Sequence, residues 1–150
     1  MKLSTAVGGL AGAAALTIIN QGVSQIDKEA PRLDLLGMNA VAKVAKPRMS
    51  LSDNKFFPLA LGGDLISNSL YYAMAKGNTP QQTLLRGALL GLAAGISALV
   101  LPQRMGLNAS LVNRTTKTKV MTVAWYIIGG LVAASAINLL ESKKTTAAHG

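Results

Sequence analysis

Asp64 is the one charged residue that lies well inside an apolar stretch of this chain, residues 56–75. A helix through that stretch would place Ser67, Asn68 and Tyr71 on the same face as Asp64, because residues three, four and seven apart share a helical face. A carboxylate with hydroxyl and amide neighbours can hold a proton or a cation. We therefore take Asp64, Ser67, Asn68 and Tyr71 as a candidate polar site within the membrane.

A carboxylate at this depth needs a reason, since it costs on the order of 2.5 to 3.5 kcal/mol to insert at the centre of a bilayer. One interpretation is functional, with Asn68 and Tyr71 supplying further polar groups around a protonatable or cation-binding Asp64. The other is structural, with a buried acid hydrogen-bonded to Asn20, Ser97, Ser135 or a tyrosine hydroxyl. The sequence leaves both open.

Other side chains suited to catalysis or metal binding are scarce. The chain has no cysteine, and its one histidine is the penultimate residue, His149. These counts exclude a Ser-His-Asp triad and a zinc site built from His and Cys. No Gly-x-x-x-x-Gly-Lys phosphate loop occurs. We therefore predict a protein that is not an enzyme, with no catalytic residues, no metal and no cofactor.

The composition indicates a multi-pass membrane protein. Of the 150 residues, 50% are hydrophobic and only 14% charged, whereas soluble domains carry about 25% charged residues. The charges cluster and leave four stretches long enough to cross about 30 Å of hydrocarbon. We predict an all-α, four-transmembrane-helix bundle in one domain, 1–150, with spans 3–22, 56–75, 87–103 and 120–140 and a flexible tail, 141–150. The first span has a basic start, so cleavage as a signal peptide is the alternative to a retained helix.

The loop between the first two predicted spans contains a helical pattern of its own, over residues 32–46. Leu33, Leu36, Ala40 and Val44 recur at helical spacing, beside a basic face. This pattern is typical of an amphipathic helix lying in the membrane interface. The alternative is a helix packed across the ends of the spans. We expect anionic lipid headgroups to bind four basic residues: Arg32, Lys43, Lys46 and Arg48.

Small residues recur every four positions within the predicted spans, a spacing that lets helix backbones approach closely in a bilayer. We predict that these glycines are helix-packing positions, and the same faces could join a homo-oligomer or a larger membrane complex. The predicted packing glycines are Gly8, Gly12, Gly87, Gly91, Gly95, Gly129 and Gly130.

We interpret the net charge of +9 as a signal that orients the protein in the membrane and not as a sign of nucleic-acid binding, because the basic residues flank the spans. Ten of the fifteen lysines and arginines fall in the loops 23–55 and 103–119. The positive-inside rule places those loops in the cytoplasm and both termini outside, in the cell inner membrane. Aromatic belts are expected at the interfaces, formed by Phe56, Phe57, Trp125 and Tyr126 on one side and Tyr71 and Tyr72 on the other.

Three stretches resemble a group of small bacterial integral membrane proteins without an assigned function: Ala30 to Met38, Gly63 to Tyr72, and Asn113 to Thr122 leading into Gly129-Gly130-Leu131. Together with the third predicted span they cover most of the chain. The resemblance implies a bacterial inner-membrane setting and says nothing of a substrate.

Three functions remain in competition at this point. The first is a small transporter, channel-like protein or transport accessory that uses Asp64. The second is a structural or accessory subunit that packs through its Gly/Ala faces. The third is a lipid-binding or lipid-modifying protein that uses the amphipathic segment.

Overall fold

The computed structural model describes residues 1–45 and 56–148, and every regular element in those ranges is a helix. The all-α prediction is therefore confirmed for the described part of the chain. Two predicted headgroup residues, Lys46 and Arg48, lie outside the described residues. The helices are α1 (Leu3–Ile26), α2 (Leu33–Ala45), α3 (Phe56–Ala73), α4 (Pro80–Arg104), α5 (Ser110–Asn113) and α6 (Thr116–Ala148).

Within the described ranges, three helices are long and apolar enough to cross a membrane: α1, α4 and the Thr116–Lys143 part of α6. This finding supports the prediction of a membrane protein. The predicted second span corresponds to α3, which is not among the three. Its 18 residues rise about 27 Å at 1.5 Å per residue, slightly less than the hydrocarbon thickness.

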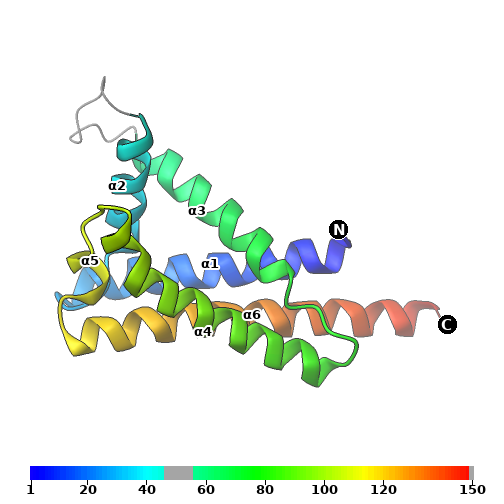
Figure 1. Cartoon of the computed structure of the whole chain (residues 1–150). Coiled ribbons are helices and arrows are strands. Elements are labelled where there is room, and N and C mark those ends of the chain that lie inside the picture. Colours follow the sequence, from blue (N-terminus) through cyan, green and yellow to red (C-terminus); the bar gives the residue numbers. More distant parts are fainter. Residues whose placement is uncertain (46–55, 149–150) are drawn as a thin grey trace.

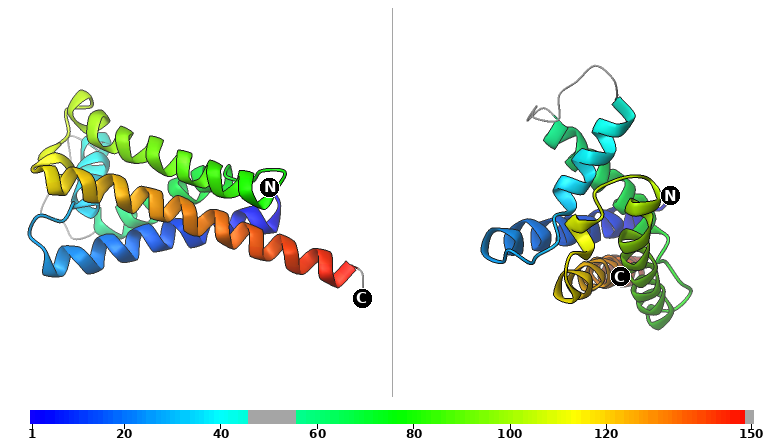
Figure 2. Two further views of the ribbon diagram at one scale, coloured as in Figure 1. Left: turned by 90° about the horizontal axis from the view of Figure 1, so that it is seen from below. Right: turned by 60° about the vertical axis from the view of Figure 1, so that its left-hand side comes forward.

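Helix α6 lies at the centre of a bundle, with α1 along one side and α4 along the other (Figures 1 and 2). Helix α3 packs most closely on this trio near its own C-terminal end and diverges toward its start (Figure 1). Helix α2 fills the resulting wedge, where a Cβ on Gly37 would stand 3.6 Å from the Cβ of Ala60. Both chain termini lie at the same end of the bundle (Figure 1).

Glycines line both seams of α6. A Cβ added to Gly12 would collide with the carbonyl oxygen of Gly129, and one added to Gly87 would collide with that of Gly130. The structure places all seven predicted packing glycines at such close approaches between helices. Backbones therefore touch directly where a larger side chain would hold them apart, as in other membrane helix pairs.

Helix α3 uses its glycines differently. Gly9 of α1 packs against the backbone of α3 at Ser69 and Ala73, so α1 supplies the small residue at this contact. Gly62 and Gly63 of α3 have open space where a side chain would be. Gly9 is not among the predicted packing glycines; it stands beside Gly8 but faces a different helix.

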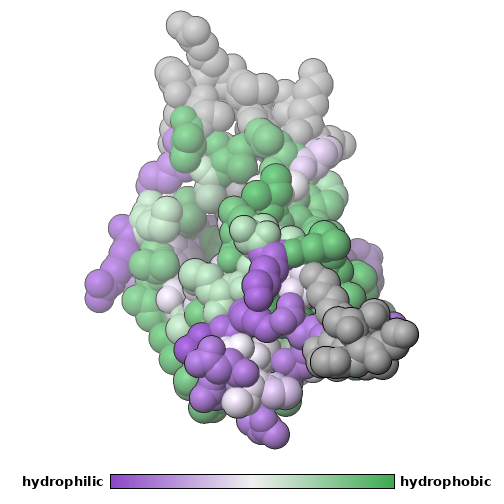
Figure 3. Space-filling view, turned by 90° about the vertical axis from the view of Figure 1, so that its right-hand side faces the viewer, coloured by the Kyte–Doolittle hydropathy of each residue, from purple (hydrophilic) through white to green (hydrophobic). Residues whose placement is uncertain are grey.

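Polar contacts tie the helices together at both ends of the bundle. At one end, Lys117 of α6 pairs with Asp27 after α1 at 2.6 Å. At the other, Glu141 of α6 accepts hydrogen bonds from Ser4 of α1 and from Lys76, which follows α3, the latter at 2.6 Å. Figure 3 looks onto this second end and shows hydrophilic residues gathered there, with apolar side chains covering the flanks.

Three helices extend beyond the predicted spans: α1 continues to Ile26, and α4 and α6 are longer at both ends. Helix α4 begins at Pro80 because the hydroxyl of Thr79 accepts a hydrogen bond from the backbone N–H of Gln82 and caps the helix, with proline at its first position. The expected start at residue 87 came from counting back to Arg86, and it overlooked this cap. Helix α6 continues to Ala148, through most of the predicted tail.

Candidate functional site

Asp64 lies on α3 where this helix diverges from α1, and its carboxylate is part-buried. The side-chain amide of Asn68, one turn later, donates a hydrogen bond of 2.8 Å to Oδ1 of Asp64. The hydroxyl of Ser67 donates to the main-chain oxygen of Asp64 at 3.1 Å and not to its carboxylate. Among the described residues, no lysine or arginine forms an ion pair with Asp64. Within the ranges 1–45 and 56–148, the carboxylate thus has one hydrogen-bonding partner and no counter-charge.

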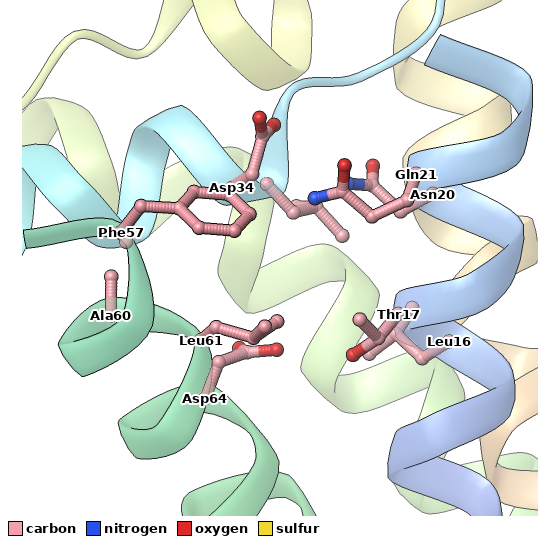
Figure 4. Close-up of a pocket in the computed structure, with 11 residues that line it drawn as sticks. Leu16, Thr17, Asn20, Gln21, Asp34, Phe57, Ala60, Leu61 and Asp64 are labelled. Atoms are coloured by element: carbon pink, nitrogen blue, oxygen red, sulfur yellow. The ribbon is translucent and has the colours of Figure 1, made fainter. Parts of the chain in front are cut away.

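A small, partly open cavity of about 20 Å³ lies on the α1 side of Asp64, between α1, α2 and α3. Thr17, Asn20 and Gln21 of α1 line it, together with Asp34 of α2. The side chains of Thr17 and Asp64 point toward one another across this space, whereas the carboxylate of Asp34 points away from it (Figure 4). The volume is sufficient for one water molecule or one bare ion.

Two oxygens of α1 at this cavity have no hydrogen-bond partner. These are Oγ1 of Thr17 and Oδ1 of Asn20, both buried. Asn20 is only 3% exposed. Buried polar atoms without partners are rare, and each one calls for an explanation because leaving it unpaired costs about 1 to 3 kcal/mol.

A larger groove of about 440 Å³ lies on the other side of Asp64. Its polar wall comes from α3, where Asp64, Ser67, Asn68 and Tyr71 all line it, as the predicted shared face requires. The opposing walls come from α2, α4 and the turn after α4, and they are largely apolar. They include Leu36, Ala40, Ala98, Leu101 and Met105. The volume falls within the range of about 300 to 1,000 Å³ that is usual for small-molecule sites.

Three tyrosines lie close to the groove, and two of them anchor α3. The hydroxyl of Tyr71 donates to the main-chain oxygen of Leu90 at 2.9 Å, and the hydroxyl of Tyr72 donates to that of Tyr126 at 2.8 Å. Tyr72 is completely buried against α6, so the expected interfacial belt does not include it. Its hydroxyl finds an acceptor inside the bundle, which makes burial favourable.

Of the predicted headgroup residues, Arg32 and Lys43 already have partners within the chain. The guanidinium of Arg32 makes two hydrogen bonds to the carboxylate of Asp34, at 3.0 and 2.8 Å. This contact raises the pKa of Arg32. The ammonium group of Lys43 donates to the main-chain oxygen of Met105, at the end of α4. The contact of Lys43 joins α2 to the end of α4, whereas the pair of Arg32 and Asp34 is local to the start of α2.

The cavity residues that are absent from the predicted site come mainly from α1. Asn20 is predicted as one of the hydrogen-bond partners of a structural Asp64, and Thr17 is not predicted at the site. Both lie three residues apart on one face of an apolar helix, a pattern that could have drawn attention to them. Tyr126 was expected at an interface, yet it lines the groove.

Comparison of the chain with protein-family models, with curated proteins and with solved structures finds no match.

Proposed function

We propose that the chain crosses the membrane four times, with α3 as a span in addition to α1, α4 and α6. The ends of the other helices support this topology. α1 finishes beside the start of α6, where Asp27 pairs with Lys117, and α1 starts beside the end of α6, where Ser4 meets Glu141. Lys76, directly after α3, belongs to this second end. The chain between α1 and α4 must therefore return from one end of the bundle to the other, and α3 is the segment that makes this return.

We propose further that this protein is a small transporter or channel-like protein that binds a proton or a monovalent cation at Asp64. The observation that carries the proposal is that Asp64 lines both the small cavity beside α1 and the groove beside α4. A carboxylate that lines two spaces, with one amide partner and no counter-charge among the residues that the structure describes, is suited to take up a cation from one side and release it to the other. A purely structural acid would be surrounded by hydrogen-bond partners.

The test is ion flux in liposomes that contain the purified protein. We expect wild type to conduct protons or sodium under an imposed gradient, and Asp64→Asn to reduce that flux at least tenfold while folding normally. Asp27→Asn is the matched control, because it removes a carboxylate at the end of the bundle. Equal flux in wild type and Asp64→Asn, or no flux in either, would reject the proposal.

One observation favours a second candidate, a lipid-binding protein. The walls of the groove opposite Asp64 are largely apolar, which suits an acyl chain or another amphiphile. A lipid that occupies the groove should be displaced by Ala40→Trp, a change that would fill the space between α2 and α4. Native mass spectrometry of the two proteins, extracted with mild detergent, would show a bound lipid in wild type alone.

A further inference from the structure

We propose that the groove between α2, α3 and α4 binds a hydrophobic monovalent organic cation. The charge of this molecule pairs with the carboxylate of Asp64, and its apolar body lies against α2 and α4. The inference rests on the proposed function, since it uses the same carboxylate, and it names the class of cation that the groove accepts. Protonated or quaternary amines that carry hydrocarbon or aromatic groups belong to this class.

The charge of the groove selects a monovalent cation. Among the described residues that line the groove, Asp64 is the one that carries a charge. Its Oδ1 is bonded to Asn68, another groove residue, so this carboxylate oxygen lies on the groove side. Opposite charges attract strongly in surroundings of low dielectric constant. An anion would be repelled, and a divalent cation would leave an uncompensated charge among apolar side chains, which is costly.

The walls of the groove favour an organic cation over an inorganic one. A hard inorganic cation prefers to be surrounded by oxygens. On the walls from α2 and α4, Ser97 supplies the one side-chain oxygen among the described residues. An organic cation needs polar partners only around its charged end, which the α3 wall with Asp64 provides. The opposing walls then pack against its apolar body.

The size and exposure of the groove suit such a body. Its volume of about 440 Å³ is within the range of sites for small organic molecules. Leu101 and Met105, on the wall opposite α3, are 50% and 55% exposed. A bound apolar group would cover part of this surface, and removing apolar surface from water is favourable. The charge thus selects the sign of the ligand, and the walls select its apolar character.

The experiment measures equilibrium binding of three probes, each tested alone, to the purified full-length protein in a non-ionic detergent. Tetraphenylphosphonium is an apolar monovalent cation, tetraphenylborate has nearly the same shape with the opposite charge, and tetramethylammonium has the same charge without the apolar body. We expect saturable binding of tetraphenylphosphonium. Tetramethylammonium should bind at least tenfold more weakly, because it cannot cover the apolar walls.

Variants then locate the bound cation. Asp64→Asn should weaken tetraphenylphosphonium binding at least tenfold and leave any binding of tetraphenylborate unchanged. Ala98→Phe should also weaken it at least tenfold, because the larger side chain fills the groove from α4. Two controls should stay within twofold of wild type. Asp27→Asn removes a carboxylate that does not line the groove, and Ile66→Phe enlarges a side chain on an exposed apolar face outside it.

A second measurement leaves Asp64 unchanged, so it remains valid if Asp64→Asn does not fold. Ser67→Cys places a thiol on the polar wall of the groove. Saturating tetraphenylphosphonium should slow its modification by a small thiol reagent at least fivefold. The same reagent should modify Ile66→Cys at a rate that the cation does not change, because position 66 lies outside the groove.

Equal affinity for tetraphenylphosphonium in wild type and Asp64→Asn would overturn the inference. Equal affinity of wild type for tetraphenylphosphonium and tetramethylammonium would overturn it too, and so would a thiol at position 67 that the cation does not protect. The two proposals can fail separately. Proton or sodium flux that needs Asp64, without tetraphenylphosphonium binding, would sustain the proposed function and reject this site. Binding that needs Asp64, without any flux, would sustain the site and reject transport.

Discussion

The side-chain amide of Asn68 donates a hydrogen bond of 2.8 Å to the carboxylate of Asp64, one turn earlier on α3. Among the described residues it is the one hydrogen bond that this carboxylate accepts. Asn68 approaches from the groove, which it also lines. The cavity side of Asp64 is left to α1, where Thr17 and Asn20 also have unpaired oxygens. This asymmetry is the structural basis on which we propose a ligand at Asp64.

The close helix contacts predict opposite effects for two glycine substitutions. Gly9→Ala should destabilise the bundle by about 1 to 3 kcal/mol, because the new Cβ would collide with the backbone of α3. Gly62→Ala should stabilise it by about 0.5 to 1 kcal/mol, since a Cβ there meets open space and alanine favours the helix. Unfolding in mixed micelles would measure both. Similar effects at the two positions would contradict the packing described here.

Tyr72→Phe should destabilise the protein by about 1 kcal/mol. The change removes the hydrogen bond from the hydroxyl to the main-chain oxygen of Tyr126 and leaves the ring in place. The same unfolding assay applies. Tyr71→Phe is the comparison, because Tyr71 is more exposed and its lost bond can be replaced more easily. A larger loss in Tyr71→Phe would argue against Tyr72 as the anchor between α3 and α6.

The ion pair at the end of α1 predicts a pH dependence. The hydrogen bond from Lys117 lowers the pKa of Asp27. A carboxyl group whose pKa is lower in the folded protein contributes stability above its unfolded pKa of about 3.9, and that contribution is lost as the pH falls through the folded value. Wild type should therefore exceed Lys117→Gln in Tm at neutral pH, and the difference should narrow below about pH 4. A difference that is constant from pH 7 to pH 3 would contradict this assignment.

The four-span topology predicts where single cysteines react. The chain has no native cysteine, so each engineered thiol can be labelled alone. Lys2→Cys and Lys143→Cys should react with an impermeant maleimide from one side of the membrane, and Lys117→Cys from the other. If α3 did not cross the membrane, the three remaining spans would place residues 2 and 143 on opposite sides of it. The positive-inside rule further predicts that positions 2 and 143 react from outside the cell.

Much of the fold could be predicted from the sequence because its main signals are local. Charges mark the ends of helices, and the four-residue spacing of glycines marks the faces that meet. The shared face of Asp64, Asn68 and Tyr71 follows from helical periodicity alone, and all three line the groove.

The remainder of the site depends on how helices sit relative to one another. Which part of α1 faces Asp64 is set by the contact of Gly9 with α3 and by the wedge that α2 occupies. Sequence periodicity carries no information on these long-range contacts, so Thr17 was missed. The early start of α4, by contrast, could have been predicted from the sequence. Thr79 and Pro80 form a recognisable helix-start signal, which counting charges overlooked.

The most direct test of the central claim is whether water reaches the Asp64 site. Ser67→Cys places a thiol in the groove one turn from Asp64, whereas Ile66→Cys places one on an exposed apolar face outside it. Thiols react as thiolates, which form in water and not in hydrocarbon. In liposomes, a small impermeant thiol reagent should modify the cysteine at position 67 at least tenfold faster than that at position 66. Equal rates, or protection at position 67, would show that the groove is closed or filled by lipid and would contradict a cation site at Asp64 served from water.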